Sequence, residues 1–144
     1  MSILSIASNA SVWRGYEYYE GKRVLAWKQT GKHEFEGAVE GSDKEPCHVM
    51  IDTEHPKKST CNCLHAEGKR IVCKHKIALF FTAFPKEADR YIAEIEEYER
   101  EEEEREQEHY DQIVKYVKSL SKEELRIALI NALVEAEERD RYRY

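Results

Sequence analysis

The chain has 144 residues, of which 36% are charged, and its formal net charge is −6. This length accommodates one modest domain with an appendage, but it is too short for two large hydrophobic cores. No segment approaches the roughly 18 consecutive apolar residues of a membrane-spanning helix, and the first residues lack the features of a secretory signal. We therefore expect a cytoplasmic protein with reduced thiols, or a nuclear protein if the source is eukaryotic.

The charge is distributed unevenly along the chain. Residues 1–86 carry 13 basic and 10 acidic side chains, whereas residues 87–144 carry 10 basic and 19 acidic ones. Basic residues are frequent in residues 54–76, where six of them stand against two glutamates. Because the acidic residues concentrate in the tail, the net charge of the whole chain does not describe the surface formed by the middle of the sequence.

The first half of the chain predicts a small sheet behind a short leader. Residues 1–12 are small and polar, and we expect a flexible N-terminus there, with a short helix as the alternative. Alternating apolar residues and turn signals predict three antiparallel strands over residues 23–30, 33–40 and 47–52. A tyrosine cluster precedes them, which we interpret as strand packing or, alternatively, as a platform for stacked nucleobases: Tyr16, Tyr18 and Tyr19.

Three cysteines and a histidine then form two closely spaced pairs, Cys61 with Cys63 and Cys73 with His75. Thiolates and imidazoles suit Zn²⁺, and a Cys₃His set completes a tetrahedron that leaves no open position. In an extended segment residues i and i+2 point to the same side, so the first pair can share one metal. The second pair can meet that metal if Cys73 precedes or begins a helix, because i and i+2 diverge within a helix. We predict one structural zinc ion.

Other interpretations of these thiols stay open. Buried cysteines often behave as small apolar residues, and another metal is compatible with the same ligands. A disulfide framework is disfavoured in a chain without a secretory signal. Cys47, His48 and His65 compete for a ligand position, although Cys47 fits better as a core residue of the third strand.

Helices are expected to follow the metal ligands. The first should cover residues 74–83, and Pro85 suits the first turn of the next. Residues 99–109 contain no apolar side chain, and a helix is favoured there over a linker. Ser121 and Glu124 predict a capping box for a last helix, whose apolar stripe consists of Leu125, Ala128, Leu129, Ala132, Leu133 and Ala136.

The two ligand pairs, followed by Lys76-Ile77-Ala78-Leu79, resemble the SWIM zinc finger. Residues 14–24 are similar to the segment that leads into the finger in bacterial proteins of this type, and the likeness extends over about residues 13–83. The chain differs from many relatives in carrying Leu64-His65-Ala66 after the second cysteine. The resemblance implies a meander of strands ahead of the finger and a role in binding DNA or protein, with a helicase, transposase or recombination factor as a conceivable partner.

These observations predict an α+β protein with three regions: a flexible segment 1–12, a β-meander with a zinc finger over 13–84, and an acidic helical region, a hairpin or bundle, over 85–144. The expected function is a non-enzymatic adaptor that binds DNA, RNA or protein. Its candidate nucleic-acid contacts are Lys57, Lys58, Lys69, Arg70, Lys74 and Lys76. The alternative is a small regulatory or structural oligomer that assembles through the C-terminal helices, with zinc purely structural. A hydrolase that uses His33, His48 or His55 has no supporting spacing.

Overall fold

The computed structural model describes residues 2–143, and their contacts divide the chain into two units. The finger unit comprises residues 1–93, and the tail unit comprises residues 94–144. The finger unit contains α1 (Ile3–Ile6), α2 (Asn9–Glu20), β1 (Val24–Gln29), β2 (Glu34–Val39), β3 (Cys47–Asp52), a 3-10 turn (Pro56–Lys58), β4 (Thr60–Cys61) and α3 (Lys74–Ala83). Helix α4 (Pro85–Ser119) begins in the finger unit and continues in the tail unit, which ends with α5 (Lys122–Arg141).

The sheet of the finger unit is antiparallel and has the strand order β1-β2-β3-β4. Phe35 pairs with Ile51 across β2 and β3, and Val49 pairs with Cys61 across β3 and β4. The alternation that the sequence predicted for β2 is confirmed, because residues 35, 37 and 39 are buried and those between them are more exposed. The predicted meander is therefore present, and the short strand β4 extends it to the first metal-ligand pair.

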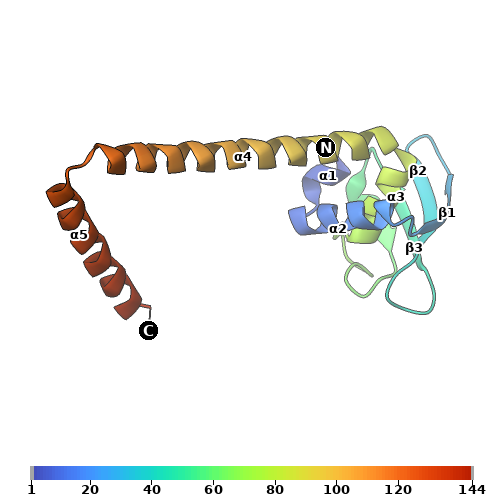
Figure 1. The fold of residues 1–144 in the computed structure, drawn as a ribbon. Helices are drawn as coiled ribbons and strands as arrows, with labels where there is room; N and C mark the ends of the chain where they lie inside the picture. The colour runs from blue at the N-terminus through green and yellow to red at the C-terminus, as the bar shows by residue number, and fades with distance from the viewer. Residues whose placement is uncertain (1, 144) are drawn as a thin grey trace. The chain divides into compact units, whose positions relative to one another are not determined.

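Helix α3 forms the centre of the finger unit. It lies between α2 and the sheet (Figure 1). It contacts α2 on one side and all four strands on the other, and every side chain from His75 to Phe81 is buried. A helix that is covered from two sides is apolar around most of its circumference, which explains the run Ile77-Ala78-Leu79-Phe80-Phe81. The helix ends at Ala83, directly before Phe84 and Pro85.

A glycine in α2 permits the close packing of α2 on α3. A Cβ atom added at Gly15 would lie 2.4 Å from both the Cβ and the Cγ2 atoms of Ile77, and 2.9 Å from the backbone oxygen of Lys74. Carbon atoms in contact are normally about 3.5–4.0 Å apart, so no larger residue fits without a shift of the helices. This contact positions the beginning of α3, from which two of the predicted ligands come.

The N-terminal segment differs from the sequence-based expectation of flexibility over residues 1–12. Ser2 and Ser8 accept hydrogen bonds from backbone N–H groups as the N-caps of α1 and α2, and Ile3 and Val12 are buried. Short polar residues in this segment therefore act as helix caps, which composition alone does not separate from loop residues.

The tyrosine cluster is helical, so its interpretation as strand packing is wrong. Tyr16 and Tyr19 lie three residues apart on α2 and pack near Phe81 of α3, with ring centroids 6.0 and 6.1 Å away. Tyr91, from the first turns of α4, lies 5.5 Å from the same ring. The cluster joins three helices, and with the buried Ala88 it includes the beginning of α4 in the finger unit.

The tail unit consists of helix with little buried surface. Residues 99–109 belong to the continuous helix α4, and the capping box of Ser121 and Glu124 is confirmed at the start of α5. No described residue of α5 is buried, so α4 and α5 do not form a packed bundle within the tail unit. None of the described helices combines the length and the apolar character needed to cross a membrane.

Replacing Gly15 by alanine tests the close contact between α2 and α3. We expect Gly15→Ala to lower the free energy of unfolding by about 2 kcal/mol, since the new methyl group overfills a packed contact. Gly31→Ala is the matched control, because a Cβ there would meet only the flexible side chain of Glu34. Denaturant unfolding of the zinc-loaded proteins measures both effects, and equal stability of the two variants would contradict the packing argument.

Candidate metal centre

The first ligand pair lies at the end of the sheet. Cys61 is the last residue of β4 and is held by pairing with Val49 of β3. Between the two cysteines, Asn62 turns away and its side-chain oxygen accepts a hydrogen bond of 2.8 Å from the backbone N–H of His48. This bond attaches the segment to β3, so that the thiols on either side of Asn62 are presented to the interior together.

A compact loop returns the chain from the first pair to the second. The backbone oxygen of Cys63 accepts hydrogen bonds from the N–H groups of Ala66, at 3.1 Å, and Glu67, at 2.9 Å. Gly68 has a φ of +70°, in the left-handed region that glycine adopts without strain. Ala66 and Val72 are buried, which fixes both sides of the loop against the core.

The second ligand pair lies at the N-terminus of α3. Cys73 is the N-cap residue in an extended conformation, and His75 is in the first turn. The Nδ1 atom of His75 lies 3.8 Å from the Sγ atom of Cys61 and 3.9 Å from that of Cys73. The prediction that Cys73 precedes the helix while His75 reaches back is confirmed.

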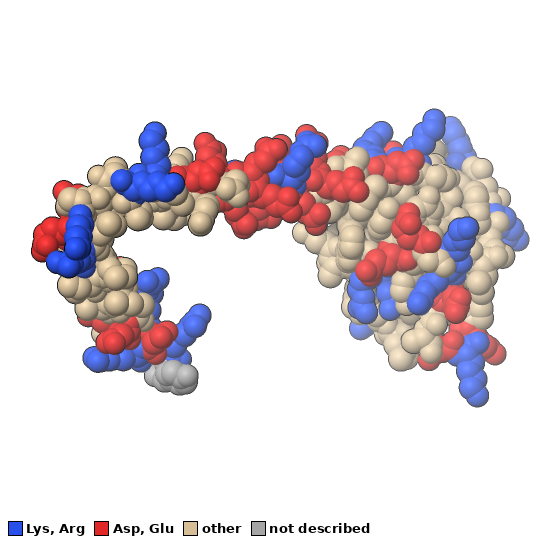
Figure 2. Space-filling view, viewed as in Figure 1, with Lys and Arg blue, Asp and Glu red and all other residues tan. Residues whose placement is uncertain are grey.

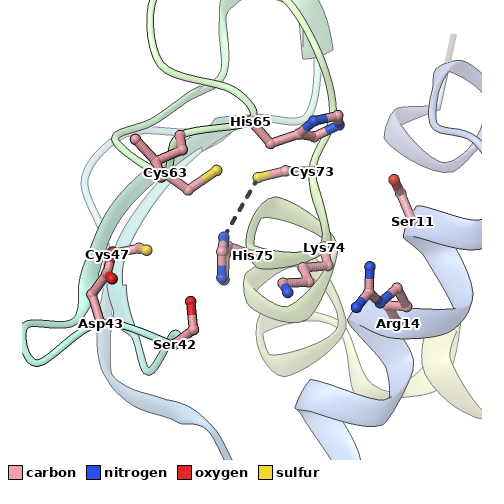
Figure 3. A pocket seen from close by; sticks show the side chains of 11 residues that line it. Ser11, Arg14, Ser42, Asp43, Cys47, Cys63, His65, Cys73, Lys74 and His75 are labelled. Atoms are coloured by element: carbon pink, nitrogen blue, oxygen red, sulfur yellow. Dashed lines mark hydrogen bonds between the residues drawn. The ribbon is translucent and has the colours of Figure 1, made fainter.

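The four side chains fit a tetrahedral zinc ion. Their ligand atoms, one each from Cys61, Cys63, Cys73 and His75, all lie within 4.8 Å of one another. Zinc bonds of about 2.3 Å to sulfur and 2.0 Å to nitrogen place tetrahedral ligand atoms roughly 3.5–3.8 Å apart, close to the two distances from His75. Figure 3 shows the sulfur atoms of Cys63 and Cys73 facing one another beside the His75 ring. Zinc bound by this donor set is structural, because all four positions are taken by protein.

The orientation of His75 indicates which ring nitrogen binds the metal. Its Nδ1 atom faces the thiols, whereas its Nε2 atom is buried and has no hydrogen-bond partner among the described residues. Coordination through Nδ1 leaves a proton on Nε2, which then requires an acceptor. Ser42 and Asp43 line the same cavity and carry oxygen atoms suited to this role (Figure 3).

The protein favours a thiolate at Cys73 before any metal is bound. The pKa of Cys73 is lowered to about 3, mainly by a hydrogen bond from Cys61 and, to a smaller extent, by the His75 ring and the backbone N–H of Lys76, while burial opposes this shift. The hydrogen bond to Cys73, followed by burial, raises the pKa of Cys61. The metal must therefore displace the proton of Cys61, and zinc binding weakens as the solution becomes more acidic.

A buried lysine accompanies the ligands. The side chain of Lys76 is fully buried, and its Nζ atom donates a hydrogen bond of 2.6 Å to the backbone oxygen of Ile71. Burial lowers the pKa of Lys76, whereas the nearby Cys73, Cys61 and Cys63 raise it. Three thiolates and a neutral imidazole around Zn²⁺ carry one net negative charge, so the ammonium group neutralises a buried anion.

This position corrects one predicted contact, because the buried Lys76 cannot reach a phosphate group of nucleic acid. Sequence reasoning assigned it to the surface as one more basic residue of the finger. A signal was available, since Lys76 directly precedes the apolar run of α3 and follows a ligand. A lysine in such a helix is buried along with its neighbours and needs a compensating charge nearby.

The three competitors for a ligand position lie outside the group of four. Cys47 begins β3, is half-buried and packs against the core, as expected for a strand residue. The Nε2 atom of His48 is 2.7 Å from a carboxylate oxygen of Glu36 on the outer face of the sheet. His65 is exposed on the loop.

We predict that Cys61→Ala abolishes stoichiometric metal binding and unfolds the region from β3 to α3, because structural zinc contributes on the order of 10 kcal/mol to folding in finger peptides. Cys47→Ala serves as the control and should retain one metal per chain. Elemental analysis and the absorption of the cobalt-substituted protein measure the outcome. A fully folded metal-free wild-type protein would refute the structural role of the ion.

The buried charge leads to a separate prediction. Lys76→Met keeps the aliphatic volume but removes the ammonium group, and we expect zinc affinity to fall by about 10-fold or more, as for other groups that support metal ligands. Lys69→Met removes an exposed charge from the loop and should change affinity little. Competition with a chelator of known affinity compares the two variants, and equal affinities would show that Lys76 does not compensate the charge of the site.

Comparison with known proteins agrees with this geometry. Residues 47–84 match the family model described as the SWIM zinc finger. No curated protein and no solved structure matches the chain. The matched segment begins with β3, contains both ligand pairs and ends just after α3, so it covers the elements that surround the predicted ion. Residues 47–84 thus match a SWIM zinc finger, and within them Cys61, Cys63, Cys73 and His75 form one zinc site.

Proposed function

We propose that the finger unit is a non-enzymatic module that binds nucleic acid through a basic surface beside the zinc site. The observation that carries this proposal is a shallow cavity whose lining includes Lys57, Lys58 and Arg70. The two lysines come from the 3-10 turn before β4, and the arginine comes from the loop between the ligand pairs. One segment precedes the first ligand pair in the sequence and the other follows it, and together they supply one cluster of positive charge.

Two other basic residues predicted to contact nucleic acid, Lys69 and Lys74, differ in their position relative to this cavity. Lys69 is exposed next to Arg70 in the same loop and extends the surface. Lys74 lies elsewhere, with its Nζ atom 4.9 Å from the centroid of the Tyr18 ring, which Arg23 also faces at 4.5 Å. The basic surface is therefore defined as Lys57, Lys58, Lys69 and Arg70.

The chemistry of this surface suits a phosphate backbone better than a small substrate. Lysine and arginine side chains on an open surface bind phosphates by charge and release counterions, which gives affinity without sequence preference. The cavity contains one acidic side chain, Glu54, which lies 3.7 Å from His33. A contact with an acidic protein segment is the alternative, in line with an adaptor for a helicase, transposase or recombination factor.

The absence of enzymatic activity is part of the proposal. A zinc ion with four protein ligands has no position for a water molecule or a substrate, unlike catalytic zinc. Two of the histidines considered for hydrolysis have carboxylate partners, since His48 pairs with Glu36 and His33 lies near Glu54. The zinc ion would serve the module by holding the loop of Arg70 and the strand that follows Lys58 in fixed positions.

Titration with single- and double-stranded oligonucleotides at two salt concentrations tests the proposal. We expect binding whose affinity falls steeply with salt, and we expect the triple variant Lys57→Glu, Lys58→Glu, Arg70→Glu to lose most of it. The slope of log affinity against log salt should fall by about 0.7–0.9 for each phosphate contact removed.

The matched control reverses three exposed lysines outside the cavity: Lys28, Lys32 and Lys44. It introduces the same change in net charge, so a general loss of electrostatic attraction would affect both triple variants equally. Zinc content is measured for each protein to exclude unfolding. No binding to any oligonucleotide at low salt would reject the nucleic-acid proposal and favour a protein partner.

A further inference from the structure

The tail unit exposes an apolar surface that the zinc finger does not explain. Ten large apolar or aromatic side chains between residues 110 and 134 are between 37% and 62% exposed, among them Ile130 at 60% and Leu133 at 59%. They come from the last turns of α4 and the first four turns of α5: Tyr110, Ile113, Tyr116, Val117, Leu125, Ile127, Leu129, Ile130, Leu133 and Val134. We define these ten residues as the tail surface.

The large apolar side chains are spread so widely around α5 that they need contacts on more than one side of the helix. At 100° per residue, the large apolar side chains from Leu125 to Val134 cover an arc of roughly 200°. A helix that packs on a single neighbour typically needs an apolar stripe of about 100°. A single flat contact would therefore leave half of these side chains in water, whereas a bundle of helices covers them.

Charge divides the tail unit into two parts with different properties. Residues 94–109 carry ten acidic and two basic side chains, whereas residues 110–143 carry seven of each. Figure 2 shows the acidic side chains as a dense band on α4, while α5 displays tan atoms between mixed charges. The apolar part is thus electrically neutral, and two copies of it meet without net repulsion.

We propose that the tail surface is the interface of a homodimer, in which residues 110–141 of two chains form a four-helix arrangement. A second copy supplies two further helical segments with the same apolar arcs, which is what α5 needs for coverage from two sides. The ten half-exposed side chains offer on the order of 800 Å² of accessible surface per chain, which is about the area that one partner buries in a standard interface. A two-fold symmetric contact of this kind is closed and self-complementary.

The neutral tail surface fits a second copy better than a nucleic acid or a membrane. Phosphate groups have no basic cluster to contact here, and the acidic residues 94–109 repel them. Helices that lie on membranes carry basic residues on their polar face, whereas the polar face of α5 includes Glu124, Glu135 and Glu138. A different protein with a complementary helix is the remaining class, and the experiment separates it from a second copy.

Light scattering coupled to size-exclusion chromatography, applied to the full zinc-loaded chain, tests this inference. We expect the wild-type protein at tens of micromolar to have twice the mass of one chain and to keep this mass at high salt. Leu129→Asp combined with Leu133→Asp should weaken the dimer at least 100-fold and produce monomers. Asn131→Asp is the matched control, because it places the same charge on the polar side of the same helix and should leave the dimer intact.

The zinc content and the cobalt spectrum are expected to be unchanged in all these variants, and far-ultraviolet circular dichroism reports whether α5 stays helical. A second substitution, Ile130→Asp, repeats the test on the other side of the apolar arc. A wild-type chain that is monomeric over the whole concentration range would overturn the proposal and assign the tail surface to a different protein. A dimer that persists in both apolar-face variants would overturn it as well.

Discussion

The coordination of one zinc ion by two segments of the chain is the constraint on which the finger unit depends. One segment is the end of a two-residue strand, and the other is the first turn of α3. The two-residue strand pairs only with β3 at the edge of the sheet, and a core of this size offers limited hydrophobic stabilisation. Zinc joins the sheet to the central helix, so the position of α3 follows from the metal site as much as from packing.

The metal site also explains an unusual arrangement of charge in the interior. Three thiolates around a divalent ion place a net negative charge beneath the sheet, at the N-terminus of a helix, where backbone N–H groups already favour an anion. Lys76 adds a full positive charge within the same helix and is itself kept from water. The charges of the zinc ligands and of the lysine therefore cancel one another at the helix terminus, and the loss of either leaves a buried charge without compensation.

The two units are stabilised by different means. In the finger unit, aromatic rings of α2, α3 and α4 and the apolar face of the sheet surround a short buried helix. In the tail unit, local capping and the intrinsic helix propensity of glutamate, arginine and lysine support the helices, while the apolar side chains are left exposed within that unit. The dimer that we propose would supply the missing tertiary contacts, and the basic surface of the finger would then occur twice in each particle.

Several features follow from the sequence by itself, because they depend on short-range geometry. The strands follow from alternation of residues such as Phe35 and Val39, and the capping box follows from Ser121 and Glu124 three positions apart. The zinc ligands follow from spacing, since Cys61 and Cys63 share one side of an extended segment. These patterns involve neighbours along the chain, whose relative placement is set by backbone periodicity.

Tertiary structure alone decided the features that depend on distant neighbours. The tyrosines before β1 are compatible with a strand, and they are helical because Gly15 lets α2 lie against α3 and brings Tyr16 to Phe81. The sequence suggests that Lys76 is a surface residue, but it is buried because its helix is enclosed between α2 and the sheet. Lys57, Lys58 and Arg70 become one surface because the chain folds back around the metal. Whether a residue is buried, and which distant residues come together, depend on which segments of the chain meet. No local pattern of residue types encodes these contacts.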